Sequence, residues 1–190
     1  ISQLYSTDGI YGLVAQTYAH YVVPFLIFAG VLGKTGAGEA YTRLAMALVG
    51  RTKGGGAKAC AASSVLTGMV LGSGAADIAV SGSVTIPLMK RTGFRPHEAA
   101  AVEVSSSVGS HLMPPVMGAA AFLMASFTGI PYHQIALHAV VVGLLYYVGV
   151  YASVHFLCAK HPHVTALRRE EVPSFGEALR EAWPFLLPVV

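Results

Sequence analysis

The chain has 190 residues, of which 54% are hydrophobic and only 11% are charged, and its formal net charge is +3. Soluble domains carry about 25% charged residues, so this composition excludes an ordinary soluble domain and predicts an all-α polytopic membrane protein. Two cysteines, Cys60 and Cys158, are too few and too far apart for a disulfide framework or a metal site. The basic residues flank apolar segments, which gives no support to a nucleic-acid partner.

The apolar segments differ in length, and length decides which of them can cross a bilayer. Residues 10–33 can span, because about 20 residues cross the hydrocarbon core. Residues 40–49 are too short and contain Arg43, which favours an interfacial helix. Three longer segments and the start of a further span follow, and we expect the whole chain, 1–190, to be a fragment of a transporter membrane domain: 56–89, 97–128, 133–158 and 176–190.

The basic residues set the orientation of these segments. All but one of the 12 Lys and Arg residues follow the first span, the segment 56–89 or the segment 133–158. The positive-inside rule places these three groups in the cytoplasm. Both ends of 56–89 then lie on one side, and the segment is too short to cross twice. We predict a re-entrant hairpin of two half-helices within the membrane lipid, broken at Gly72-Ser73-Gly74, where protein or an aqueous cavity must surround the irregular backbone.

The segment 97–128 runs from a basic flank to the uncharged loop GIPYH and therefore crosses the membrane. A continuous helix of this length would measure about 48 Å. Pro114 and Pro115 remove two backbone donors and disfavour helix just before them. We predict a broken span whose first half ends near Gly109 and whose second half begins at Val116, with SHLMPP unwound between them.

Two adjacent interrupted helices are typical of the binding site of a secondary transporter. Carbonyl groups at half-helix C-termini coordinate Na⁺, and N–H groups at half-helix N-termini attract a carboxylate. The predicted Na⁺ ligands lie in both interruptions: Leu71, Gly72, Ser73, Ser107, Gly109 and Ser110. The predicted substrate-binding residues are Gly74, Ala75, Ala76, Asp77, Ser81 and His111.

Three titratable residues in these segments have more than one interpretation. Asp77 can cap the second half-helix, take part in cation or proton coupling, or stay a neutral acid. Glu103 can pair with a basic residue or stabilise the hairpin, and the structural role is favoured. His111 can contact substrate or satisfy a buried carbonyl group.

The run GMVLGSGAADIAVSGSVTIPLMKRTGFRPHEAAAVE, followed by MPPVMGAAAFLMA, resembles the large membrane subunit of tripartite ATP-independent periplasmic (TRAP) transporters. The resemblance is strongest to the fused-permease branch that works with TAXI-type binding proteins, which commonly has Asn where this chain has Asp77. It implies an elevator-type transporter in the bacterial or archaeal cytoplasmic (inner) membrane. It also implies Na⁺-coupled uptake of organic acids, such as C4-dicarboxylates or glutamate, with no organic cofactor. The implied partners are a periplasmic solute-binding protein and a small membrane subunit, fused or separate.

Two alternatives remain at this point. One is a two-hairpin carboxylate/Na⁺ symporter that needs no binding protein. The other is an intramembrane serine hydrolase that uses His111 or Asp77. No serine lies in a G-x-S-x-G pattern, HEAAAVE lacks the second histidine of H-E-x-x-H, and the chain has no P-loop. We therefore expect a transporter and not an enzyme.

Overall fold

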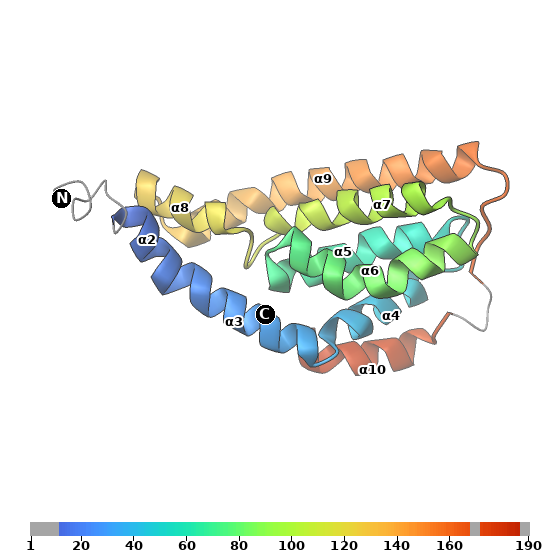
Figure 1. The fold of residues 1–190 in the computed structure, drawn as a ribbon, viewed down its shortest axis with the longest axis horizontal. Helices are drawn as coiled ribbons and strands as arrows, with labels where there is room; N and C mark the ends of the chain where they lie inside the picture. The colour runs from blue at the N-terminus through green and yellow to red at the C-terminus, as the bar shows by residue number, and fades with distance from the viewer. Residues whose placement is uncertain (1–11, 168–171, 187–190) are drawn as a thin grey trace.

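The computed structural model describes residues 12–167 and 172–186, and every regular element in these ranges is helical (Figure 1). This confirms the prediction of an all-α protein. Residues 10–11 of the predicted first span and 187–190 of the predicted last segment lie outside the described residues. The α-helices are α2 (Leu13–Thr17), α3 (Val23–Lys34), α4 (Ala37–Val49), α5 (Gly55–Leu71), α6 (Gly74–Arg91), α7 (Pro96–Val108), α8 (Ala119–Thr128), α9 (Tyr132–Lys160) and α10 (Phe175–Leu186). A π-helical segment, η1 (Tyr18–Val22), joins α2 to α3, and a 3₁₀ segment, η2 (Gly109–His111), follows α7.

The first helical run, α2–η1–α3, changes its hydrogen-bond pattern just before a proline. Within η1 the Val23 N–H donates to the carbonyl of Tyr18, five residues earlier. Pro24 has no N–H group, so the ladder cannot continue through it unaltered, and a π-helical turn accommodates the lost bond. The run then continues to Lys34 and lies beside α8 (Figure 1).

Helices α5 and α6 form an antiparallel hairpin at the centre of the bundle, joined by only two residues (Figure 1). Gly72 ends α5 with φ of +56°, a left-handed conformation that glycine adopts without a steric penalty. Ser73 is extended, and its hydroxyl accepts a hydrogen bond from the Ala76 N–H at 3.5 Å, which caps α6. The interruption therefore falls at the GSG sequence.

The broken span is unwound for longer than the sequence predicted. Helix α7 ends at Val108, but the second half, α8, begins at Ala119 and not at Val116. The cause is local: Met117 has φ of +54°, and the Gly118 N–H donates to the carbonyl of His111 at 2.9 Å. This bond closes the unwound segment into a loop, which also contains a cis peptide bond between Pro114 and Pro115.

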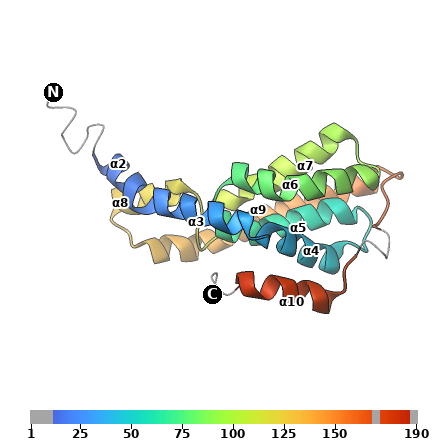
Figure 2. The same ribbon diagram turned by 60° about the horizontal axis from the view of Figure 1, so that its bottom comes forward.

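Helix α4, which covers the predicted interfacial segment 40–49, begins three residues earlier, at Ala37, and packs inside the bundle. Tyr41, Thr42 and Ala45 are at most 1% exposed. Helix α10 covers one side of α4 and α5 covers another (Figure 2). The side that carries Arg43 reaches the surface, where its guanidinium pairs with Glu181 at 2.7 Å.

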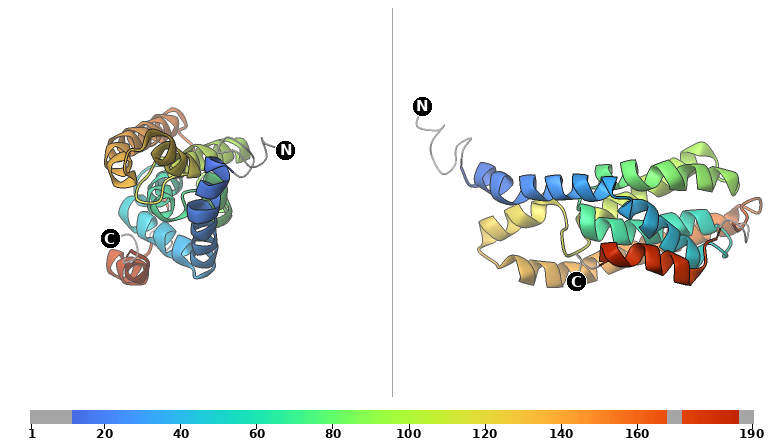
Figure 3. Two further views of the ribbon diagram at one scale, coloured as in Figure 1. Left: turned by 90° about the vertical axis from the view of Figure 1, so that its left-hand side faces the viewer. Right: turned by 90° about the horizontal axis from the view of Figure 1, so that it is seen from below.

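Several connections between helices lie at one or the other end of the long axis of the molecule (Figures 1 and 3). The α4–α5 and α6–α7 connections and the end of α9 lie at one end, and the α8–α9 connection lies at the other. After α9 the chain crosses the first end: the Thr165 N–H donates to the Thr92 carbonyl at 3.0 Å, and the Leu167 N–H donates to the Gly50 carbonyl at 3.3 Å. This end carries Lys90 and Arg91 of α6 and Lys160 of α9, and we call it the basic end. Both outer ends of the hairpin therefore lie at the basic end of the molecule.

Within the described ranges, α9 is the one helix that is long and apolar enough, by length and composition alone, to cross a membrane. Its outer face is apolar and exposed, and it includes Leu137, Val141, Leu145, Val148 and Phe156. Exposed apolar surface of this extent requires a covering of lipid or protein.

Candidate functional site: the hairpin tip and the broken span

The tip of the hairpin presses against the broken span through its glycines. A Cβ atom on Gly74 would lie 2.9 Å from the Ser107 carbonyl oxygen and 3.0 Å from Cε1 of His111. A Cβ atom on Gly72 would lie only 2.0 Å from the carbonyl oxygen of Met117. Real side chains do not make such contacts with backbone atoms, so glycine at these positions lets two interrupted backbones meet.

A hollow of about 250 Å³ opens beside this contact. Three elements supply its walls: Leu71 to Ser73 from the hairpin tip, His111 and Met117 from the unwound segment, and Phe122 from α8. Val22 of the first helical run also lines the hollow. The walls are a mixture of apolar side chains and backbone polar groups, which suits a small ligand with one charged end.

The electrostatics of the tip follow from the two helix ends that meet there. The first N–H groups of α6 have no acceptor within their own helix, and this end carries partial positive charge. The last carbonyl groups of α5 carry partial negative charge, and that of Gly68 accepts the Gly72 N–H at 3.2 Å. An anion and a cation are therefore favoured within a few residues of each other.

His111 stands at the edge of this hollow with an identifiable tautomer when neutral. Its Nδ1 atom lies 3.1 Å from the carbonyl oxygen of Val108. Because a carbonyl oxygen can only accept, Nδ1 carries hydrogen, and Nε2 is the acceptor in the neutral ring. The ring therefore satisfies a carbonyl group and also lines the hollow, and its contact with a substrate stays a prediction.

Asp77 lies away from the hollow. Its side chain is fully buried; Oδ1 accepts a hydrogen bond from the Thr67 hydroxyl, and Oδ2 accepts one from the Ser110 hydroxyl at 3.2 Å. The carboxyl group thus joins α6 to α5 and η2, whereas Ser73 supplies the cap. Of the other predicted substrate-binding residues, Ser81 is also buried, and Ala75 is exposed.

Glu103 of α7 makes a further polar connection, from α7 to both helices of the hairpin. Its Oε1 atom accepts a hydrogen bond from the Ser81 hydroxyl at 2.5 Å. Its Oε2 atom accepts hydrogen bonds from the Thr85 hydroxyl and, at 3.0 Å, from the Cys60 thiol. Among the described residues the ion pairs are Arg43–Glu181 and His161–Glu98, so Glu103 stabilises the hairpin without a basic partner.

The hydroxyl partners of these two acids were not predicted from the sequence, although their spacing along the helices indicates a shared polar face. Asp77, Ser81 and Thr85 are four residues apart and share one face of α6. Ser63 and Thr67 repeat this spacing on α5. A polar face within otherwise apolar helices predicts a buried network, but the sequence does not show which helix lies opposite.

The predicted Na⁺ ligands are only partly brought together. Leu71 to Ser73 lie at the tip, and the Ser107 carbonyl lies against Gly74. Ser107 also has a buried hydroxyl without a hydrogen-bond partner in the described structure. Gly109 instead packs against the Tyr146 and Tyr147 rings, and its carbonyl accepts the Leu112 N–H at 2.9 Å.

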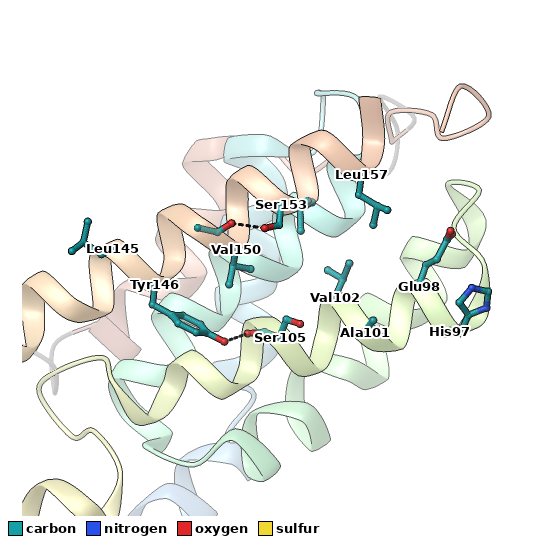
Figure 4. A pocket seen from close by; sticks show the side chains of 12 residues that line it. His97, Glu98, Ala101, Val102, Ser105, Leu145, Tyr146, Val150, Ser153 and Leu157 are labelled. Atoms are coloured by element: carbon teal, nitrogen blue, oxygen red, sulfur yellow. Dashed lines mark hydrogen bonds between the residues drawn. The ribbon is translucent and has the colours of Figure 1, made fainter. Parts of the chain in front are cut away.

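A larger groove, of about 730 Å³, runs between α7 and α9 (Figure 4). Its walls are mostly apolar, and they include Val102 and Val150. Tyr146 directs its hydroxyl to the Ser105 carbonyl at 2.7 Å, as Figure 4 shows. The Ser153 hydroxyl donates to a carbonyl of its own helix. His97 and Glu98 line one end of the groove, and the remaining wall offers few polar groups to orient an organic acid, in spite of the size of the groove.

Comparison with known proteins identifies the class to which this arrangement belongs. Residues 2–190 match the family described as the DctM component of the tripartite ATP-independent periplasmic transporters. The chain belongs to this family, which confirms the resemblance to a TRAP large membrane subunit. The family consists of transporter permeases, which are integral proteins of the inner membrane and are not enzymes. Membership of the TAXI-type branch stays a prediction.

Individual relatives are similar at moderate identity. The chain is 27% identical over 170 residues to the isethionate TRAP transporter permease protein DctMQ of Oleidesulfovibrio alaskensis, covering 88% of the chain and 26% of the relative. It is 29% identical to the ectoine TRAP transporter large permease protein TeaC of Halomonas elongata, covering 87% and 38%. It is 27% identical to the C4-dicarboxylate TRAP transporter large permease protein DctM of Pseudomonas aeruginosa, covering 98% and 45%. The chain thus spans less than half the length of each of these relatives.

Proposed function

We propose that this chain forms part of the moving transport domain of a Na⁺-coupled carrier that takes up small organic acids. The observation that carries the proposal is the meeting of two interrupted helices at one hollow. Carbonyl groups at the end of α5 and the Ser107 carbonyl provide oxygen ligands, which hard cations prefer. The N-terminus of α6, beside His111, provides N–H groups and partial positive charge for a carboxylate.

The α5–α6 pair acts in this proposal as a re-entrant hairpin. Its outer ends lie at the basic end of the molecule, and its tip lies beside the break between α7 and α8 (Figure 1). Irregular backbone is stable at membrane depth where protein or an aqueous cavity surrounds it, and here Met117 and Val116 contact the tip. The hairpin and the broken span then move together against a scaffold, as in an elevator.

The glycine contacts and the buried acid networks support movement as one body. Asp77 and Glu103 each connect α6 to other helices through buried hydrogen bonds. Binding of Na⁺ near the tip orders the backbone that receives the carboxylate, so each ligand raises the affinity for the other. This reciprocal effect is the thermodynamic basis of coupled uptake.

The names of the relatives support a choice of first substrates. They include a C4-dicarboxylate permease, an isethionate permease and an ectoine permease, so small organic acids are the first substrates to test. A periplasmic solute-binding protein delivers the substrate, and a small membrane subunit completes the permease. This subunit is fused or separate.

The test is uptake by the complete permease in proteoliposomes. Labelled C4-dicarboxylate and glutamate are offered with an inward Na⁺ gradient, with and without the periplasmic binding protein. Uptake that requires both Na⁺ and the binding protein is the expected result. Uptake that requires Na⁺ alone would establish the symporter that needs no binding protein, and uptake without a Na⁺ gradient would contradict Na⁺ coupling.

A further inference from the structure

Glu103 is a buried acid at the junction of three helices, outside the hollow at the hairpin tip. It belongs to α7, and its side chain meets Cys60 of α5 and both Ser81 and Thr85 of α6. Its exposure is 1%. A carboxyl group that is removed from water in this way, with no basic partner, has a large electrostatic cost if it is always ionised.

The hydrogen count around Glu103 allows two protonation states in one heavy-atom arrangement. The Ser81 hydroxyl lies 2.8 Å from the Asp77 carbonyl oxygen and 2.5 Å from Glu103 Oε1. The Thr85 hydroxyl lies 3.0 Å from the Ser81 carbonyl oxygen and also contacts Glu103 Oε2. Each hydroxyl has a single hydrogen and therefore donates to one of its two acceptors at a time.

When Glu103 is ionised, both hydroxyls donate to the carboxylate. When Oε2 binds a proton, the new O–H bond donates to the Thr85 oxygen, and the Thr85 hydroxyl turns to the Ser81 carbonyl. No bond other than the O–H bond at Oε2 forms, and the proton comes from the aqueous phase. The carboxyl group goes from a charge of −1 to neutral.

The spacing favours a proton over a metal cation. Oxygen ligands stand about 2.4 Å from a hard cation, which keeps them about 3 Å or more from one another. The Ser81 and Glu103 oxygens are 2.5 Å apart, with the hydrogen of the Ser81 hydroxyl between them, which is too close for both to be ligands of one hard cation. A Cβ atom on Gly82 would also approach Oε1 to 3.3 Å, which shows how closely this side of the carboxyl group is packed.

A second observation is a buried hydroxyl beside the cluster that can change its hydrogen bond when Glu103 binds a proton. The Ser106 hydroxyl is fully buried and faces the Cys60 thiol, yet it makes no hydrogen bond of normal geometry. It can accept the thiol hydrogen when the protonated Glu103 no longer requires it. The cluster therefore has one more polar group than a fixed network needs.

Among the residues that the structure describes, the titratable groups around the cluster supply no compensating positive charge. Cys60 of α5 contacts Glu103, and Asp77 of α6 and Tyr147 of α9 lie near Cys60. Lys58 of α5 instead lies over the Tyr151 ring, 5.9 Å from its centroid. A bound proton is thus the simplest source of neutrality.

We propose that Glu103 is a proton-binding site of the carrier and that its proton is exchanged during transport, in addition to Na⁺. The proposal rests on the proposed function, since proton occupancy sets the charge of the hairpin and α7 as they move. The ionised form bonds α7 to α6 through two hydroxyl donors, and the neutral form frees one of them. Uptake is then driven by an inward proton gradient as well as by Na⁺.

The first measurement is infrared difference spectroscopy on the complete purified permease between about pH 5 and about pH 9. We expect a protonated-carboxyl band that disappears on alkalinisation and is missing in Glu103→Gln. Gln resembles the protonated acid and can donate to Thr85, so this variant keeps the fold. Glu98→Gln, which changes another acid of the same helix, is the matched control. A band that does not change with pH, or that survives in Glu103→Gln, would overturn the proposal.

The second measurement is uptake at a constant Na⁺ gradient with and without an inward proton gradient. Wild type and Glu98→Gln are expected to respond to the proton gradient, and Glu103→Gln is expected to lose the response. If Glu103→Gln responds like wild type while wild type and both variants still require Na⁺, the proton site is wrong and the proposed function stands. If wild-type uptake ignores Na⁺, Na⁺ coupling fails, and the infrared result still decides the proton site.

Discussion

The substitution Gly72→Ala tests the contact between the hairpin tip and the broken span. The added Cβ atom would sit 2.0 Å from the Met117 carbonyl oxygen, whereas ordinary contact begins at 3.4 Å, so one of the two backbones must move by more than 1 Å. The left-handed conformation of Gly72 adds about 1–2 kcal/mol for any residue with a Cβ atom. Overpacking of a closely packed contact adds about 1–3 kcal/mol.

A matched control separates these two effects. Gly129 also has a left-handed conformation, with φ of +69°, but a Cβ atom there would meet nothing within 4 Å. Gly129→Ala therefore has the conformational cost of about 1–2 kcal/mol alone. Ser73→Ala removes only a long hydrogen bond of 3.5 Å and is expected to cost less than about 1 kcal/mol.

The assay is thermal unfolding and Na⁺-driven uptake of the complete permease carrying each substitution. We expect Gly72→Ala to lower both the unfolding temperature and the uptake rate more than Gly129→Ala, because only Gly72→Ala adds the overpacking cost of about 1–3 kcal/mol. Ser73→Ala should stay closest to wild type. Equal losses for Gly72→Ala and Gly129→Ala would refute the tight contact, and so would a larger loss for Ser73→Ala.

Three further predictions concern the polar contacts. Thr67→Val leaves a buried oxygen of Asp77 without its donor and should lower the stability of the complete permease by about 1–3 kcal/mol, measured by thermal unfolding. Arg43→Met removes a surface ion pair whose side chains are 47% and 46% exposed, and it should cost at most about 1 kcal/mol, with the loss shrinking as salt is added. The Arg95 N–H donates to the carboxylate of Glu98 at 2.9 Å at the start of α7, and Glu98→Gln should lower the unfolding temperature slightly, because a neutral amide oxygen is a weaker acceptor than a carboxylate at a helix N-terminus.

Ser83→Ala is the control for Thr67→Val, since the exposed Ser83 hydroxyl bonds only to the carbonyl of Val80 in its own helix. It should change stability by no more than about 0.5 kcal/mol. If Ser83→Ala and Thr67→Val have the same effect, the Asp77 network is not stabilising. An ion-pair loss in Arg43→Met that does not vary with salt would contradict the assignment of that pair as a solvent-exposed contact.

The helical class and the family could be predicted from the sequence because both depend on local pattern. Composition excluded a soluble domain, and the GSG run predicted an interruption at the place where α5 ends and α6 begins. The extent of the second break could not be predicted from prolines alone. The left-handed Met117 and the bond from Gly118 to His111 delay α8 to Ala119, and both depend on the folded loop.

The candidate site was less predictable, because side-chain direction depends on which helices become neighbours. Asp77 was expected at the tip by its position in the first turn, but its carboxyl group turns to Thr67 and Ser110. Val22 and Phe122 join the hollow from segments about 100 residues apart, which helical periodicity does not reveal. The Na⁺ and substrate assignments stay predictions.

The most direct test of the account is protection of the hairpin tip by ligands. Ser73→Cys places a thiol in the hollow, and Cys60 and Cys158 are buried, so in a complete permease whose cysteines outside this chain have been replaced a polar maleimide should label the new thiol. Ser83→Cys, on the exposed face of α6, is the control. We predict that Na⁺, but not K⁺, slows the labelling of Ser73→Cys, that substrate slows it further, and that Ser83→Cys is unaffected. Labelling of Ser73→Cys at the same rate with and without Na⁺ and substrate, in a permease that still transports, would contradict the placement of the site at the hairpin tip.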